Sequence, residues 1–204
     1  MIEPYAAFAT SWLAIAVIGA WAAGEAIALP IVPDVALGIL LLSAPQQLPI
    51  LSATAILSGV AGALALWSLI RRHPAAVKSM LAAQPGLGLP GLEEARDRIA
   101  QRGPLVGFAM FGPGLPLKAY TAGLAEVAPR TGYVAVAGYA LINRLTRLLP
   151  PAIAFALAAP LVANSELSPL VFGALYFAGW AAFYVVYWRG RGRPRRSSAT
   201  PGPP

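Results

Sequence analysis

The amino-acid sequence predicts an all-α, polytopic integral membrane protein with two oppositely oriented re-entrant helical hairpins that form an inverted repeat. The 204-residue chain is 58% hydrophobic and 11% charged, with a mean hydropathy of +0.66, outside the usual composition of soluble domains. Four stretches lack Asp, Glu, Lys and Arg: residues 4–24, 35–70, 148–165 and 167–188. Since about 20 helical residues cross a bilayer core of about 30 Å, these stretches provide three to five crossings.

The first half of the chain reads as two apolar helices around an interrupted segment. Residues 5–24 and 49–70 are each expected to cross the membrane as one helix. On the second of these, Ser58 and Gly62 lie one turn apart and predict close helix–helix contact. Residues 25–46 suit a re-entrant hairpin, because prolines remove helix donors. The prolines of this segment are Pro30, Pro33 and Pro45.

The most polar internal part, residues 74–102, is predicted to contain an amphipathic helix at the cytoplasmic membrane surface. Arg71 and Arg72 precede it, and the positive-inside rule places them in the cytoplasm. Glu94 and Arg98 have the i, i+4 spacing of a favourable ion pair. The apolar face of this helix is formed by Leu92, Ala95, Ile99 and Ala100.

The second half repeats the pattern of a broken apolar segment followed by helices. Residues 104–123 are apolar, with Lys118 just past the break. The helix at residues 131–149 is expected to be interrupted by Pro150–Pro151, and residues 167–188 form the last span. The breaks in the first of these segments are Gly112, Pro113, Gly114 and Pro116.

The two broken segments share a Pro-x-x-Pro pattern followed by an ionisable residue. It appears as PIVPD at residues 30–34 and within PGLPLK at residues 113–118. With residues 71–102 and the C-terminal tail in the cytoplasm, the first hairpin enters from outside and the second from the cytoplasm. This arrangement is an inverted repeat whose broken helices meet near the membrane midplane.

The domain organisation is simple: residues 1–188 form one transmembrane domain and residues 189–204 a disordered basic cytoplasmic tail. The net charge of +7 is concentrated in this tail, which contains RGRGRPRR directly after an apolar helix. Such residues anchor topology and attract anionic lipid, so nucleic-acid binding is not expected. Both termini are expected in the cytoplasm. The Ala-, Gly-, Pro- and Arg-rich composition is typical of a high-GC prokaryote, which suggests the cytoplasmic (inner) membrane.

The residue inventory argues against most catalytic classes. The chain has no cysteine and one histidine, His73, which excludes thiolate chemistry and multi-histidine metal sites. Its only aspartates are Asp34 and Asp97, too few for metal-dependent phosphotransfer, and no Walker loop is present. We therefore expect a protein that is not an enzyme and needs no cofactor or metal.

The ionisable residues inside apolar segments are the candidate functional residues, since charge in a membrane is costly. Glu25 is a candidate for proton coupling or headgroup binding, or a structural acid that caps the broken helix. Two roles remain open for Asp34: the N-cap of a helix that starts near Val35, or a coupling site. Lys118 is a candidate for lipid-phosphate binding or a lysine that snorkels to the interface.

Two arginines one turn apart complete the set of candidates. Arg144 is the better candidate for lipid phosphate, because it lies deeper in its helix and a guanidinium binds phosphate through two hydrogen bonds. Arg147 is expected to pair with an acid. Asn143 is expected to bond to a neighbouring helix.

Residues 92–143 resemble the core of the DedA family, also called the VTT or SNARE-associated Golgi protein family. The shared features are a charged helix that ends at Arg102–Gly103 and a Pro-containing re-entrant stretch that closes at Ala122–Gly123. The first half also resembles the family's Glu-x4-Pro element, through Glu25 and Pro30. Under this resemblance, Gly123 is also one of the break residues of the second hairpin.

The chain departs from the family pattern at three places. Where bacterial members usually carry arginines around the second-hairpin proline, it has Met110 and Pro116. Proline at the second of these positions resembles the eukaryotic-type variant. Asp34 directly follows Pro33, whereas the family's acid usually stands two residues after the proline.

The resemblance implies lipid translocation, either phospholipid scrambling or flipping of a polyprenyl-phosphate carrier. The expected partners are therefore membrane lipids, such as anionic phospholipid or polyprenyl phosphate, and self-association into a homo-oligomer stays open. Two other functions remain open: a non-transporting scaffold that assembles membrane proteins, and a proton-coupled exporter of small solutes.

Overall fold

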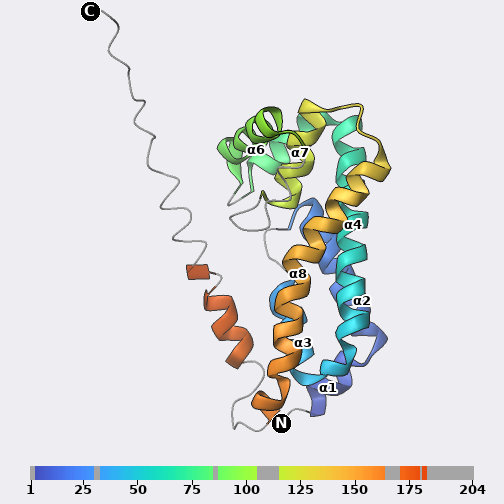
Figure 1. Ribbon diagram of the computed structural model, residues 1–204, viewed down its shortest axis with the longest axis vertical. Helices are drawn as coiled ribbons and strands as arrows, with labels where there is room; N and C mark the ends of the chain where they lie inside the picture. The colour runs from blue at the N-terminus through green and yellow to red at the C-terminus, as the bar shows by residue number, and fades with distance from the viewer. Residues whose placement is uncertain are drawn as a thin grey trace, which may run out of the picture.

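A computed structural model describes residues 3–29, 33–84, 87–104, 115–163, 171–179 and 181–182 (Figure 1). These residues are helical or lie in turns and connections, with no strand among them, so the predicted all-α class is confirmed for them. Residues 171–179 are helical and pack on α3 and α8. The other elements are α1 (Glu3–Ala9), α2 (Trp12–Ile27), α3 (Asp34–Ser43), η1 (Pro45–Gln47), α4 (Leu48–Arg72), α5 (Pro74–Ala82), α6 (Gly88–Arg102), α7 (Leu117–Val127) and α8 (Tyr133–Ala163).

The first apolar segment is not one helix, contrary to the prediction for residues 5–24. It is divided into α1 and α2 at Thr10–Ser11. Ser11 has extended backbone dihedrals, and its Oγ accepts a hydrogen bond of 3.3 Å from the Ala14 N–H. A serine at this position satisfies a free donor of the new helix, so it starts α2 and ends the preceding turn.

Helix α4 is the centre of the bundle and packs on α2, α7 and α8. Its glycines allow the close approach that Ser58 and Gly62 predicted. A Cβ at Gly62 would lie 2.4 Å from the carbonyl oxygen of Ala23, and one at Gly19 would lie 3.1 Å from Ser58 Oγ. Because the α4 backbone at Gly62 meets the α2 backbone at Ala23, and Ser58 lies against Gly19 of α2, the small-residue face is confirmed as a helix contact.

Helices α2 and α3 run in opposite directions, and the start of α2 and the end of α3 lie at the lower end of the bundle (Figure 1). Contacts of Gly19 with Ser58 and of Gly62 with Ala23 show that α2 runs parallel to α4. Helix α3 runs back beside α8, since a Cβ at Gly38 would lie 2.7 Å from the Phe155 ring. Glu25 near the end of α2 and Asp34 at the start of α3 are both buried inside the bundle.

Helix α8 runs without interruption through Pro150, Pro151 and Pro160, so the predicted break after residue 149 is wrong. Proline removes a hydrogen bond from a helix interior, but tertiary packing can hold the helix together. Leu148 and Ala152 on either side of the proline pair are buried in one apolar cluster with residues of α2, α3 and α4.

A smaller group of helices, α5, α6 and α7, covers the upper end of the bundle (Figure 1). Helix α6 extends the predicted amphipathic helix to Gly88, with Leu92, Ala95 and Ile99 buried and Ala100 exposed. The predicted ion pair between Glu94 and Arg98 is present.

Helix α1 lies at the end of the bundle opposite the basic end of α4, where Arg71 and Arg72 are exposed (Figure 1). The N-terminal helix and this basic end therefore do not share one side of the bundle. Sequence analysis expected both on the cytoplasmic side, and the parallel run of α2 and α4 is what separates them in the bundle. The tail 189–204 lies outside the described residues.

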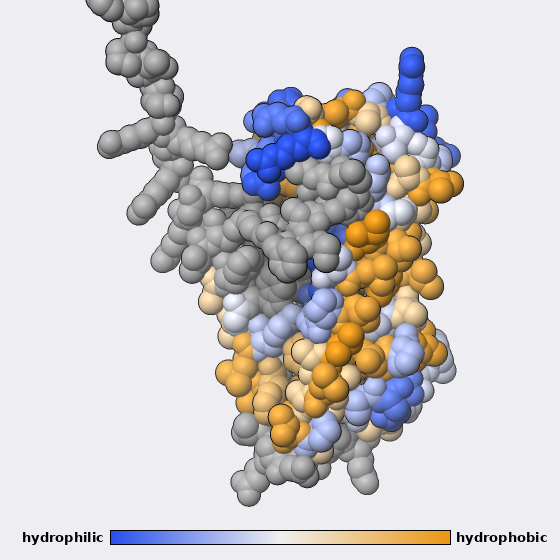
Figure 2. Space-filling view, in the orientation of Figure 1, coloured by the Kyte–Doolittle hydropathy of each residue, from blue (hydrophilic) through white to orange (hydrophobic). Residues whose placement is uncertain are grey.

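Two helical stretches of the described chain, Pro45–Arg72 and Tyr133–Ala163, are long and apolar enough to cross a membrane. Their outward faces carry large apolar side chains: Leu57 is 63% exposed, and Leu157 and Leu161 are each 74% exposed. Figure 2 shows hydrophobic residues along the long helices and hydrophilic residues at the end where α6 and α7 lie, with a smaller hydrophilic patch toward the lower end. The bundle thus combines an apolar exterior with a polar end.

Candidate functional site

A buried ion pair joins the first and last long helices of the bundle. Nη2 of Arg144 on α8 donates a hydrogen bond to Oε2 of Glu25 on α2. The two side chains are only 4% and 10% exposed. Glu25 is therefore the partner of a buried guanidinium and does not cap the end of α2, two residues further on. Both residues were predicted from sequence, but not their pairing.

Gly59 on α4 leaves the space that the Arg144 side chain needs to form this pair. A Cβ at Gly59 would lie 2.6 Å from Nε and 3.2 Å from Cδ and Cζ of Arg144. Any larger residue would occupy the space where the guanidinium crosses α4 to reach Glu25. Nε of Arg144 is buried without a hydrogen-bond partner. Sequence analysis missed Gly59, since only its neighbours Ser58 and Gly62 were assigned to a helix contact there.

Lys118 joins the start of α7 to the end of α2. Its Nζ donates a hydrogen bond of 2.7 Å to the carbonyl oxygen of Leu29, which follows the last turn of α2. The side chain is buried and lies in the electrostatic range of Glu25 and Arg144. Lys118 therefore belongs to the same charged cluster and does not snorkel to a surface.

Asp34 and Arg147 extend the cluster along α8. Asp34 is buried and lies in the electrostatic range of Arg147, Arg144 and Glu25. Asn143, one turn from Arg147, is buried, and its Oδ1 has no hydrogen-bond partner. Among the described residues Arg147 forms no ion pair with an acid, so the expected pairing is limited to electrostatic attraction to Asp34. Asn143 does not show the expected interhelical bond through its Oδ1.

The two helices that begin at this cluster run in opposite directions. Pro33 directly precedes Asp34, the first residue of α3, and Pro116 directly precedes α7. Helix α3 starts at Asp34 itself, one residue earlier than predicted, and runs toward the lower end of the bundle, whereas α7 runs toward the upper end (Figure 1). Helix N-termini carry partial positive charge, so two of them face the same polar centre.

The other predicted break residues divide into two groups. Gly123 is not a break, because it lies inside α7, where a Cβ would be 2.9 Å from the backbone nitrogen of Arg96 on α6. This glycine allows α7 to pack directly on the α6 backbone. Four of the predicted residues lie outside the described part of the chain: Pro30, Gly112, Pro113 and Gly114. Met110, at the position of a family arginine, is also outside it.

The cluster is suited to hold a charged group and lacks the features of a metal site. Among the described residues, no three His, Cys, Asp or Glu side chains gather as metal ligands. The carboxylates of Glu25 and Asp34 balance the charges of Lys118 and Arg144, and half-buried Arg147 adds positive charge. With two helix N-termini nearby, an anionic group can bind here if it replaces the Glu25 carboxylate as the partner of Arg144.

Comparison with models of protein families, with curated proteins and with solved structures returned no match. The feature of the molecule that bears on function is the buried charged cluster in an apolar bundle.

Proposed function

We propose that this protein is a membrane protein that moves lipids between leaflets, with the buried cluster of Glu25, Asp34, Lys118 and Arg144 as the headgroup site. One observation carries the proposal: these four ionisable side chains meet inside a bundle whose outer face is apolar. Charges at membrane depth are costly and mark substrate or ion pathways by default. A site at which oppositely directed broken helices meet is the arrangement of inverted-repeat transporters.

In the proposed orientation, α4 and α8 cross the membrane and the α2–α3 hairpin is re-entrant. The positive-inside rule places Arg71 and Arg72, at the end of α4, in the cytoplasm. The open end of the hairpin, with α1, then lies on the opposite side. Helices α5, α6 and α7 cover the cytoplasmic end, and the exposed leucines of α4 and α8 face the lipid tails.

The proposed step is an exchange of anions on Arg144. In the structure, Nη2 of Arg144 donates its hydrogen bond to the Glu25 carboxylate. A lipid phosphate replaces this carboxylate, and Lys118 provides a second cation after it leaves the Leu29 carbonyl. Uptake of a proton by Glu25 or Asp34 removes a competing negative charge from the site. The tails stay in the bilayer while the headgroup crosses between the hairpin ends.

The test is lipid movement in proteoliposomes that contain a headgroup-labelled fluorescent phospholipid and are exposed to a membrane-impermeant quencher. The wild type should allow quenching well beyond the outer-leaflet half. The double variant E25Q/R144Q, which removes both buried charges together, should remain folded and lose this activity. The matched control is E94Q, which breaks the exposed pair between Glu94 and Arg98 on α6 and should retain it.

Quenching that stops at one leaflet for the wild type, both with phospholipid and with a polyprenyl-phosphate carrier, would refute lipid translocation and favour a scaffold. Full activity in E25Q/R144Q would refute the assignment of the site.

A further inference from the structure

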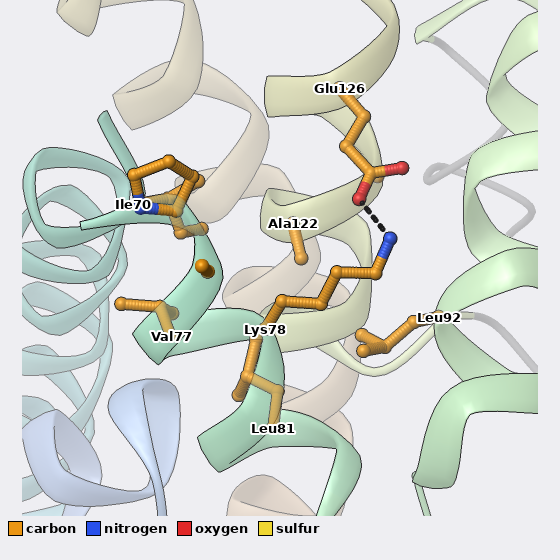
Figure 3. Close-up of a pocket in the computed structure, with 10 residues that line it drawn as sticks. Ile70, Val77, Lys78, Leu81, Leu92, Ala122 and Glu126 are labelled. Carbon is orange, nitrogen blue, oxygen red and sulfur yellow. Dashed lines mark hydrogen bonds and ion pairs between the residues drawn. The ribbon is translucent and has the colours of Figure 1, made fainter. Parts of the chain in front are cut away.

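A cavity lies away from the charged cluster, at the end of the bundle where α4 ends in Arg71 and Arg72. It has a volume of about 290 Å³ and lies between α4, α5, α6 and α7 (Figure 3). Its apolar walls include Ile70, Val77, Leu81 and Leu92. This volume is at the lower end of the range of about 300–1,000 Å³ for small-molecule sites. It can therefore take part of a lipid, such as a chain segment, but not a whole diacyl lipid.

Among the described residues that line this cavity, the two charged ones form an ion pair. Lys78 extends from α5 toward Glu126 on α7, and its Nζ lies 2.9 Å from Oε1 (Figure 3). The two side chains are 45% and 39% exposed, whereas Leu81 in the wall is fully buried. The charges are thus at the mouth, and the wall behind them is apolar. Exposed ion pairs contribute little to stability, so a ligand can separate this one easily.

We infer that this cavity is a binding site for a zwitterionic phospholipid whose headgroup carries a phosphate and a primary ammonium two carbons apart. Lys78 binds the phosphate, Glu126 binds the ammonium, and an acyl chain segment lies against Leu81 and Leu92. Each charge of the headgroup replaces one member of the existing pair, so neither Lys78 nor Glu126 is left without a partner. A purely anionic headgroup would satisfy Lys78 but would repel Glu126.

The position of the cavity agrees with this ligand. It adjoins Ile70, directly before the exposed Arg71 and Arg72 that end α4. In the orientation proposed above, this level is the cytoplasmic headgroup region. The inference uses that membrane placement but not lipid movement and not the Glu25–Arg144 cluster.

The test measures binding of two short-chain lipids, dioctanoylphosphatidylethanolamine and dioctanoylphosphatidylglycerol, to the purified full chain in detergent by native mass spectrometry. The titrations use the E25Q/R144Q background, so that the central cluster does not contribute. We expect a preference of about tenfold for the zwitterionic lipid. E126Q should remove the preference, and K78Q should weaken both lipids about tenfold.

A75F checks the cavity itself. Ala75 lines the cavity but is exposed on α5, so the ring should fill the space and abolish binding of both lipids without disturbing the core. E94Q removes a carboxylate from the neighbouring helix α6 and should leave both affinities unchanged. Equal binding of the two lipids by the E25Q/R144Q protein would overturn the inference. Binding of the zwitterionic lipid that is unchanged by E126Q and unchanged by A75F would also overturn it. Lipid movement by the wild type has no influence on either outcome.

Discussion

Removing one member of the Glu25–Arg144 pair should destabilise the protein more than removing both. The two side chains are 10% and 4% exposed, so either single substitution leaves a charge in an apolar bundle. Loss of one partner of a buried pair typically costs about 3–5 kcal/mol, whereas neutral replacement of both is often close to neutral. Asp34 lies in range of Arg144, and Lys118 lies in range of Glu25. Each remaining charge is therefore partly compensated, and we expect about 3 kcal/mol for E25Q or R144Q.

The purified protein is heated in one detergent, and thermal melting is measured as the fraction that stays monodisperse after heating. For a chain of this size, 3 kcal/mol corresponds to about 6–12 °C. E25Q and R144Q should each melt lower by this amount, and E25Q/R144Q should melt within about 4 °C of the wild type. The control E94Q breaks an exposed pair and should shift melting by at most about 4 °C. A double variant whose shift equals the sum of the two singles would refute the pairing.

Two further predictions concern the residues that position the cluster. G59A places a Cβ 2.6 Å from Nε of Arg144, so it should cost about 1–3 kcal/mol in melting assays and reduce lipid movement. G138A, at a helix position with no neighbour within 4 Å, should keep or raise the melting temperature, and the same loss in both variants would contradict the steric argument. K118M removes the bond to the Leu29 carbonyl, worth about 1.5–3 kcal/mol, and should accelerate amide hydrogen exchange in the last turn of α2. Unchanged exchange there would show that this bond does not hold the end of α2.

Several features of the fold and site could be predicted from local sequence because their causes are local. Pro33 and Pro116 directly precede helices, since a proline disfavours helix in the residue before it and so marks a boundary. Glu94 and Arg98 pair within one helix at the spacing that brings them together. The charged residues within apolar stretches were recognisable as candidates because their burial cost is independent of the fold.

Other features depended on which helices meet. The proline pair in α8 looked like a break, but packing of Leu148 and Ala152 in the core keeps the helix continuous. Gly123 looked like a hairpin end, but it is where α7 contacts the α6 backbone. The division between α1 and α2 depends on a single cap at Ser11, a signal that the long apolar stretch concealed.

The sequence by itself determined the helical class, the apolar composition and the identity of the four buried ionisable side chains. Only the tertiary structure decided that Glu25 pairs with Arg144, 119 positions away, and that Lys118 reaches the Leu29 carbonyl. The physical reason is that composition and periodicity indicate whether a residue is buried or exposed. The partner of a buried side chain depends instead on which helices cross near it. Here α2, α4 and α8 approach closely enough, at Gly59 and Gly62, for a guanidinium on one helix to reach a carboxylate on another.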